Sequence, residues 1–172
     1  FAEGTIDQHV DELTDKDMHY STDMKQLGSQ TQQMIIIKKT VNDNLYNGNY
    51  EEAINDYNTI KNKFYPGNIA VRGAMYNNIG VACDKLGKYD EAQTNYEKSI
   101  EDVETLIQNT NDDDEKIRFN KILLNRRRNY VESAIDQYSA SPETNGNLPE
   151  VIKQEITKLE TEYQSINDNM GY

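Results

Sequence analysis

The chain contains the same seven-residue pattern twice, at residues 47–53 (Asn-Gly-Asn-Tyr-Glu-Glu-Ala) and at residues 86–92 (Leu-Gly-Lys-Tyr-Asp-Glu-Ala). In each copy a tyrosine follows the glycine by two positions, and an alanine follows that tyrosine by three. A second tyrosine, Tyr57 or Tyr96, comes four residues after each alanine. A pattern that recurs at this separation predicts a structure built from stacked copies of one unit.

Each residue type in the pattern has a physical role in a pair of packed helices. Gly48 and Gly87 can adopt the left-handed backbone conformation that ends a helix. Ala53 and Ala92 allow two helices to approach more closely than larger side chains would permit. Because residues four positions apart share one helix face, the tyrosine after each alanine fills the junction beside it. The pattern therefore predicts two helix-turn-helix units packed against each other.

The pattern resembles the tetratricopeptide repeat, a family of helix-turn-helix units. In the first helix of the better-matched repeat, Tyr76, Ile79 and Gly80 stand at the family's large, leucine and glycine positions. Cys83 replaces the family's aromatic residue, a tolerable change because buried cysteine behaves as a small hydrophobe. The resemblance implies that the repeats pack through a common set of residues: Ala53, Tyr57, Tyr76, Ile79, Gly80, Gly87, Ala92 and Tyr96.

The earlier repeat departs further from the family pattern. At the matching positions of its first helix stand Ile37, Thr40, Val41 and Asn44, so the family's glycine is lost. Ala53 and Ala92 lie 39 residues apart, whereas the plain repeat spans about 34 residues. The additional residues fit a loop at residues 64–68, where Pro and Gly break the helix. Longer repeats of this kind occur in the kinesin-light-chain branch of the family.

The helical periodicity that follows residue 28 predicts an all-α domain, and the resemblance implies a right-handed α-solenoid of about three repeats. Residues 1–28 are interpreted as an acidic lead-in, partly irregular, with one short helix. We expect the first helix to run uninterrupted from a cap at Ser29 to Tyr46. The helix pairs are predicted at about residues 29–63, 69–108 and 115–168, followed by a tail at residues 169–172.

The last predicted helix begins at Pro149, a favourable first helical residue. It carries a one-sided apolar stripe, which includes Ile152, Ile156 and Leu159. This stripe either closes the end of the stack as a capping helix, which solenoids require, or forms a seam for a partner.

The chain is strongly acidic, with a net charge of −12 at pH 7. A general nucleic-acid binder needs a basic stripe that displaces phosphate counterions, so we expect no nucleic-acid partner. The same charge disfavours an anionic membrane surface, and no apolar run is long enough to cross a bilayer. Because Cys83 is the single cysteine, no internal disulfide can form. This fits a cytoplasmic or cytoskeleton-associated protein in a reducing compartment.

The sequence offers no convergent set of catalytic or metal-binding groups, so we expect no enzyme activity, cofactor or metal. The two histidines, His9 and His19, lie in the lead-in. Pairing either of them with Cys83 would require this segment to fold back onto the helices, which we do not expect. Residues 15–26 begin like a calcium-binding loop, but Tyr20 and Gln26 occupy the positions that require Gly and Glu.

A groove that binds a partner fits the sequence better. In the family that the chain resembles, the first helices line a concave surface, and some members hold a partner's carboxylates there with lysine and asparagine. Projected onto this chain, that motif falls on Lys38, Asn42 and Asn78. An ammonium group and side-chain amides can satisfy carboxylate oxygens.

Three consecutive arginines, Arg126, Arg127 and Arg128, stand out in this acidic chain. Adjacent residues of a helix point in different directions, so one ligand would rarely engage all three. They either contribute to the partner site or pair with the acidic run at residues 101–115.

Together these features favour a protein-interaction module, a scaffold or adaptor that binds a peptide or helix of another protein in the concave groove. Two alternatives remain open: an architectural subunit packed permanently in a large assembly, and a regulatory fragment of a larger enzyme or motor. Because the sequence begins at Phe1 rather than Met, we expect it to be a piece of a longer chain.

Overall fold

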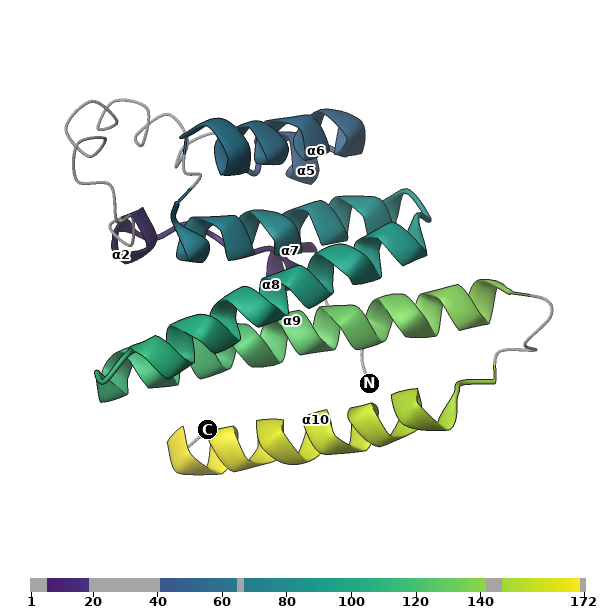
Figure 1. Ribbon diagram of the computed structural model, residues 1–172. Coiled ribbons are helices and arrows are strands. Elements are labelled where there is room, and N and C mark those ends of the chain that lie inside the picture. The colour runs from purple at the N-terminus through teal and green to yellow at the C-terminus, as the bar shows by residue number, and fades with distance from the viewer. Residues whose placement is uncertain (1–5, 19–40, 65–66, 142–146, 171–172) are drawn as a thin grey trace.

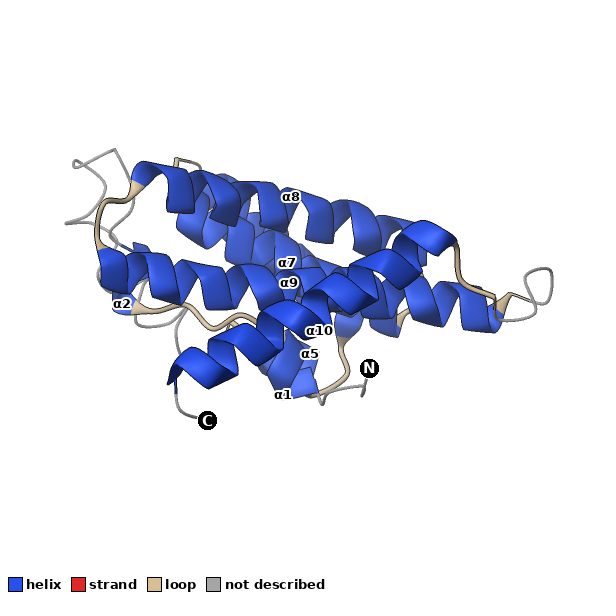
Figure 2. Cartoon of the chain, turned by 90° about the horizontal axis from the view of Figure 1, so that it is seen from below, coloured by secondary structure: helices blue, strands red, loops and turns tan. Residues whose placement is uncertain are grey.

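The computed structural model describes residues 6–18, 41–64, 67–141 and 147–170, and every regular element in these ranges is helical (Figures 1 and 2). The all-α class predicted from the sequence is therefore confirmed. The elements are α1 (Ile6–His9), α2 (Asp15–Met18), α5 (Asp43–Tyr46), α6 (Tyr50–Thr59), a π-helical turn η1 (Ile60–Phe64), α7 (Ile69–Lys85), α8 (Tyr89–Asn109), α9 (Asp113–Ala140) and α10 (Glu150–Met170).

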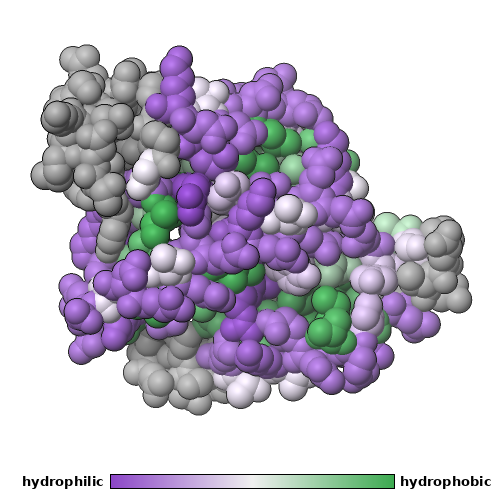
Figure 3. Space-filling view, in the orientation of Figure 1, coloured by the Kyte–Doolittle hydropathy of each residue, from purple (hydrophilic) through white to green (hydrophobic). Residues whose placement is uncertain are grey.

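The longer helices form a stack in chain order. Helix α6 packs on α7, α7 on α8, α8 on α9, and α9 on α10, and Figure 1 shows them as successive rows. Short connections join α7 to α8 and α8 to α9, which makes neighbouring helices antiparallel. Each helix buries its apolar face mainly against its neighbours, as in a helical-repeat protein. None of the described helices is both long and apolar enough to cross a membrane, and the surface in Figure 3 is largely hydrophilic.

Local sequence signals account for the ends of α7 and α9. The side chain of Asn68 accepts a hydrogen bond from the Val71 N–H and so caps α7. Asp112 accepts hydrogen bonds from the N–H groups of Asp114 and Glu115 and caps α9. These caps satisfy donors that the first turn of a helix leaves unpaired.

The two motif glycines end the first helix of each pair. Gly48 and Gly87 have φ angles of 82° and 75°, in the left-handed region that favours glycine. A Cβ atom built on either residue would meet no other atom within 4 Å, so the backbone conformation alone demands glycine there.

We therefore expect Gly87→Ala to lower the free energy of unfolding by about 1–2 kcal/mol through backbone strain. Gly87→Asn should cost less, because asparagine tolerates the left-handed conformation better than alanine. Urea unfolding followed by circular dichroism measures both values. A Gly87→Ala protein as stable as the wild type would contradict the assigned role.

The junction between α7 and α8 is the best-packed part of the stack. A Cβ on Gly80 would lie 2.6 Å from Cε1 of Tyr96, so the tyrosine ring occupies the space that glycine leaves. Ala92 and Tyr96 are buried, as are Ala53 and Tyr57 in the preceding unit. Both copies of the sequence pattern therefore lie in one hydrophobic core.

Tyr76, which we expected among the packing residues, lies outside this core. Its ring is half-buried beneath the ammonium groups of Lys61 and Lys98, which lie 4.9 and 5.4 Å from the ring centroid. The ring therefore joins α7 to η1 and α8 through cation–π contacts at the edge of the junction.

Several predicted boundaries need correction. The predicted first helix does not run unbroken to Tyr46, because residues 41–42 form a turn and α5 begins at Asp43. Asn42, the residue before α5, has a φ of −106°, and its side chain does not cap the helix but accepts a hydrogen bond from the Tyr57 hydroxyl. Ser29 lies outside the described residues. Helix α10 extends to Met170, into the predicted tail.

Helix α10 covers α9 through its own small core. Ile152 and Leu159 are buried and Ile156 is partly buried, and Leu159 packs with Leu124 and Val131 of α9. The stripe predicted from the sequence thus faces the stack, in the position of a capping helix.

The lead-in differs most from expectation. Residues 6–18 contain two single-turn helices, α1 and α2, rather than one. They fold back onto α7 and α9, which the sequence analysis did not expect. Val10 and Leu13 are buried in the main hydrophobic core, so the fold-back is driven in part by apolar burial.

Candidate functional site

Buried asparagines form a ladder across α7 and α9. Asn129 donates to Asn77 (2.9 Å), Asn77 donates to Asn78 (3.3 Å), and Asn78 donates to Asn42 (3.3 Å). The hydroxyl of Tyr57 donates to Asn42 and anchors the end of the ladder (2.9 Å). Because buried amides must be satisfied, this network fixes the orientation of each side chain.

The ladder binds the backbone of the lead-in. Asn78 Oδ1 accepts from the Asp11 N–H, and Asn78 Nδ2 donates to the Asp11 carbonyl, both at 2.8 Å. Asn77 and Asn129 both donate to the His9 carbonyl at 2.9 Å. These bonds involve only main-chain groups of the segment, so they do not depend on which side chains the segment carries.

A second set of contacts recognises carboxylates. Arg126, only 3% exposed, donates from Nε to Asp11 Oδ2 (2.8 Å) and from Nη1 to the Ser99 carbonyl (2.6 Å). A Cβ on Gly73 would lie 2.8 Å from Nη1, so the glycine makes room for this guanidinium. Burial raises the pKa of Asp11 above its ordinary value of 3.8, and Arg126 offsets only part of that rise.

The second carboxylate is that of Asp17 in α2, which lies against the start of α9. Arg118 Nη1 donates to Asp17 Oδ1 (3.0 Å), and Nη2 donates to Glu115 (2.9 Å). Asn68, the cap of α7, also donates to the Asp17 carbonyl (2.6 Å). Thr14 and Asp17 exchange backbone–side-chain bonds in a capping box that starts α2.

The other end of the segment contacts α9. His9 Nε2 forms a hydrogen bond with Glu132 Oε2, and Arg128 Nη2 donates to the Gln8 carbonyl (2.6 Å). His9 is therefore held on α9 after the lead-in folds back. From here on, the lead-in means residues 6–18, the described part of the acidic segment at residues 1–28. The lead-in site is the set of residues that bind it, which lie in α7, in α9 and at Asn68, the cap of α7.

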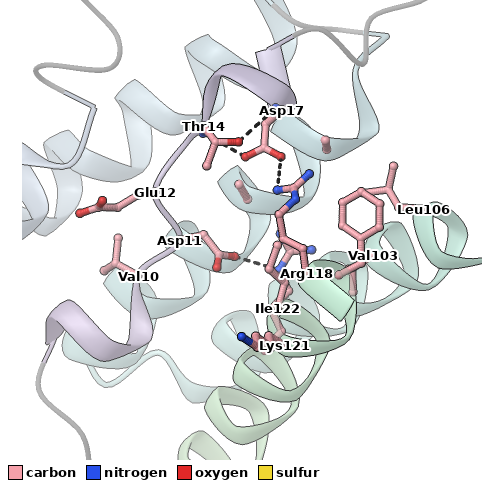
Figure 4. Close-up of a pocket in the computed structure, with 14 residues that line it drawn as sticks. Val10, Asp11, Glu12, Thr14, Asp17, Val103, Leu106, Arg118, Lys121 and Ile122 are labelled. Atoms are coloured by element: carbon pink, nitrogen blue, oxygen red, sulfur yellow. Dashed lines mark hydrogen bonds and ion pairs between the residues drawn. The ribbon is translucent and has the colours of Figure 1, made fainter. Parts of the chain in front are cut away.

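A cavity of about 540 Å³ lies beside the segment (Figure 4). One wall is the lead-in, with Asp11 and Asp17 directed toward arginines of α9. The opposite wall is largely apolar and includes Ala70, Ala74, Val103, Leu106, Phe119 and Ile122. Val103 and Phe119 are fully buried and Leu106 is 6% exposed, so little of this wall is open to solvent.

The structure brings three of the predicted partner-binding residues together, since Asn42, Asn78 and Arg126 are all linked to the Asp11 region. Arg128 contacts the segment at Gln8. Arg127 does not join them, because it pairs with Glu155 and Glu162 of α10. Lys38 lies outside the described residues.

The expectation that the arginine run pairs with the acidic run at residues 101–115 is wrong. In that run Asp102 pairs with Arg72 through bonds of 2.6 and 2.9 Å, and Glu115 pairs with Arg118 and Lys16. The three arginines point in three directions, so each found a different partner along the chain.

Several residues of the site were not predicted from the sequence, among them Asn68, Asn77, Arg118 and Asn129. One available signal was the unusual number of asparagines in helical stretches, where asparagine has low intrinsic propensity. Asn77, Asn78 and Asn129 make compensating tertiary bonds, and the lead-in backbone supplies them.

The remaining chemistry-bearing groups do not form a second site. Cys83 is buried in the main core, and burial raises its pKa from 9.0 to about 11. Within the described part of the chain, no group of three His, Cys, Asp or Glu residues is arranged to hold a metal ion.

Comparison with known proteins identifies one stretch of the chain. Residues 73–101 match the family model described as tetratricopeptide repeat. The matched stretch runs from α7 into α8 and includes Gly80, Gly87, Ala92 and Tyr96. Neither the curated proteins nor the solved structures contain a significant match to the chain.

Proposed function

We propose that this chain, which contains a tetratricopeptide repeat at residues 73–101, is a scaffold or adaptor that holds an extended segment of a partner protein at the lead-in site. Tetratricopeptide repeats generally mediate protein–protein interactions. The proposal is for a binding protein rather than an enzyme, acting in a reducing, cytoplasm-like compartment.

The observation that carries the proposal is the paired bond between Asn78 and the Asp11 backbone. One side-chain amide satisfies both the N–H and the carbonyl of a single residue, at 2.8 Å each. Such a pair requires locally extended backbone and accepts any side chain at that position. It is the contact by which a helical surface can hold a peptide chain without reading its sequence.

The surroundings of Asn78 support the same function. Its side chain is fully buried and oriented by the ladder, so little side-chain entropy is lost when a segment binds. Arg126 and Arg118 add charge-assisted hydrogen bonds to carboxylates, and these bonds favour acidic segments over basic ones.

Peptide display on the full-length chain tests this function. We expect selected peptides to bind the wild type and to lose about tenfold or more in affinity with Asn78→Ala, because two backbone hydrogen bonds disappear. Fluorescence anisotropy measures the affinities, and circular dichroism checks that the variant is folded.

Asn95→Ala is the matched control, because Asn95 bonds only to the Glu91 carbonyl of its own helix among the described contacts. It should leave peptide affinity unchanged. Selected peptides that bind Asn78→Ala as tightly as the wild type would place the interaction elsewhere and refute the proposal.

A further inference from the structure

We infer that the lead-in stands in for the partner, and that the partner is an acidic segment of similar pattern, extended beside Asn78, which binds by displacing residues 6–18. This inference rests on the proposed function. It goes further by naming the chemistry of the partner and the event that must precede its binding.

The pattern of the partner follows from what the site contacts in the lead-in. Val10 and Leu13 are buried in the main core, so these two positions call for apolar side chains. Asp11 and Asp17 meet Arg126 and Arg118, so these positions call for carboxylates. Glu12 is exposed and carries no such requirement. A matching segment therefore reads apolar-Asp-x-apolar-x-x-x-Asp.

The charges of the molecule are consistent with an acidic partner that binds at this site. A chain of net charge −12 repels acidic segments in general. At this site two arginine side chains are nonetheless held where a segment's carboxylates lie, one of them buried. A buried arginine without a carboxylate partner is strongly unfavourable, so a displacing segment has to supply one.

The pocket beside the lead-in leaves room for larger side chains. It is open to solvent on one side, has a volume of about 540 Å³, and is lined by Val10 of the lead-in and by Val103 and Phe119. A partner with larger apolar side chains facing this wall gains about fourfold in affinity for each added buried methylene.

Covalent attachment favours the lead-in. A tethered segment competes at an effective concentration on the order of 1 mM, so a partner segment sees a weakened apparent affinity. Any change that loosens the lead-in without altering α7 or α9 should therefore tighten partner binding.

The test compares two neighbouring charge changes in the full chain. Asp11→Lys places a cation against Arg126 and should expel the lead-in, whereas Glu12→Lys makes the same charge change at an exposed position. The probe is a fluorescein-labelled peptide with the sequence of residues 6–18. We expect Asp11→Lys to bind it at least tenfold more tightly than the wild type or Glu12→Lys.

Amide hydrogen exchange of residues 10–17 reports release of the lead-in independently of the probe. We expect faster exchange there in Asp11→Lys, and in the wild type at saturating probe, with α7 and α9 still protected. Leu13→Lys provides a second variant, which removes an apolar anchor instead of a carboxylate. Unchanged protection in both variants would identify the lead-in as a fixed part of the fold and overturn the inference.

Two other results would also overturn it. Release of the lead-in without a gain in probe affinity would mean that the site does not accept such a segment in trans. The display experiment separately decides the proposed function when Asn78→Ala is compared with Asn78 in the Asp11→Lys background, because the lead-in uses the same two Asn78 bonds. A concentration-dependent dimer in which each copy's site holds the other copy's lead-in would assign the site to a second copy of this chain.

Discussion

Replacing Tyr96 with alanine is expected to lower the free energy of unfolding by about 3–5 kcal/mol, the range for truncation of a buried aromatic side chain. The ring is only 1% exposed and fills the space beside Gly80, so its removal leaves a cavity that Gly80, which has no side chain, cannot fill. Urea denaturation with a circular dichroism readout gives the value. Tyr46→Ala, at a tyrosine that is 40% exposed, should cost less than about 1 kcal/mol.

A double-mutant cycle tests whether Gly80 and Tyr96 act as a pair. Gly80→Ala alone should destabilise the protein by about 1–3 kcal/mol, because the new Cβ collides with the ring. In the Tyr96→Ala background that collision is gone, so the same change should cost almost nothing. Equal costs in both backgrounds would show that the close approach of α7 to Tyr96 does not limit packing.

Replacing Leu159 with alanine should release α10 from the stack. Leu159 is fully buried, and a change of this kind costs about 2–5 kcal/mol. Because Leu159 belongs to a small core shared with Leu124 and Val131, separate from the main one, the loss should fall on α10 alone. We expect the amides of α10 to exchange rapidly while those of α7 and α8 stay protected.

Val151→Ala is the control for this experiment. Val151 also lies on α10 but is 67% exposed, so exchange should not change. If Leu159→Ala instead accelerates exchange equally in α7, α8 and α10, the helices unfold as one cooperative unit and the separation into cores has no energetic meaning.

The helices were predictable because their signals are local. The helix pair predicted at residues 69–108 is observed as Ile69–Lys85 and Tyr89–Asn109, and the cap and terminating glycine of the first helix act within a few residues. The junction residues were also predictable, since alanine and tyrosine four positions apart identify the face that must be buried. Periodicity carries this information without knowledge of the rest of the chain.

The occupant of the site was not predictable in this way. The bond from Asn78 to Asp11 joins residues 67 positions apart, and the bond from Arg126 to Asp11 joins residues 115 apart. The lead-in has little periodicity of its own, so nothing local indicated where it would lie. Helix geometry did predict that the three arginines diverge, but the identity of each partner depends on the tertiary fold.

Because the lead-in folds back onto α7 and α9, a truncation that removes it also removes contacts of the site. A fragment trimmed to the recognisable repeats, starting at residue 29 or 73, would keep Asn77, Asn78 and Arg126 but lose the backbone that satisfies them. Water would hydrate these groups, and the vacant site would be open to any acidic, unstructured segment. Pull-down baits made from such a fragment would bind acidic segments without competition from the lead-in, whereas baits that retain residues 6–18 would keep that competition.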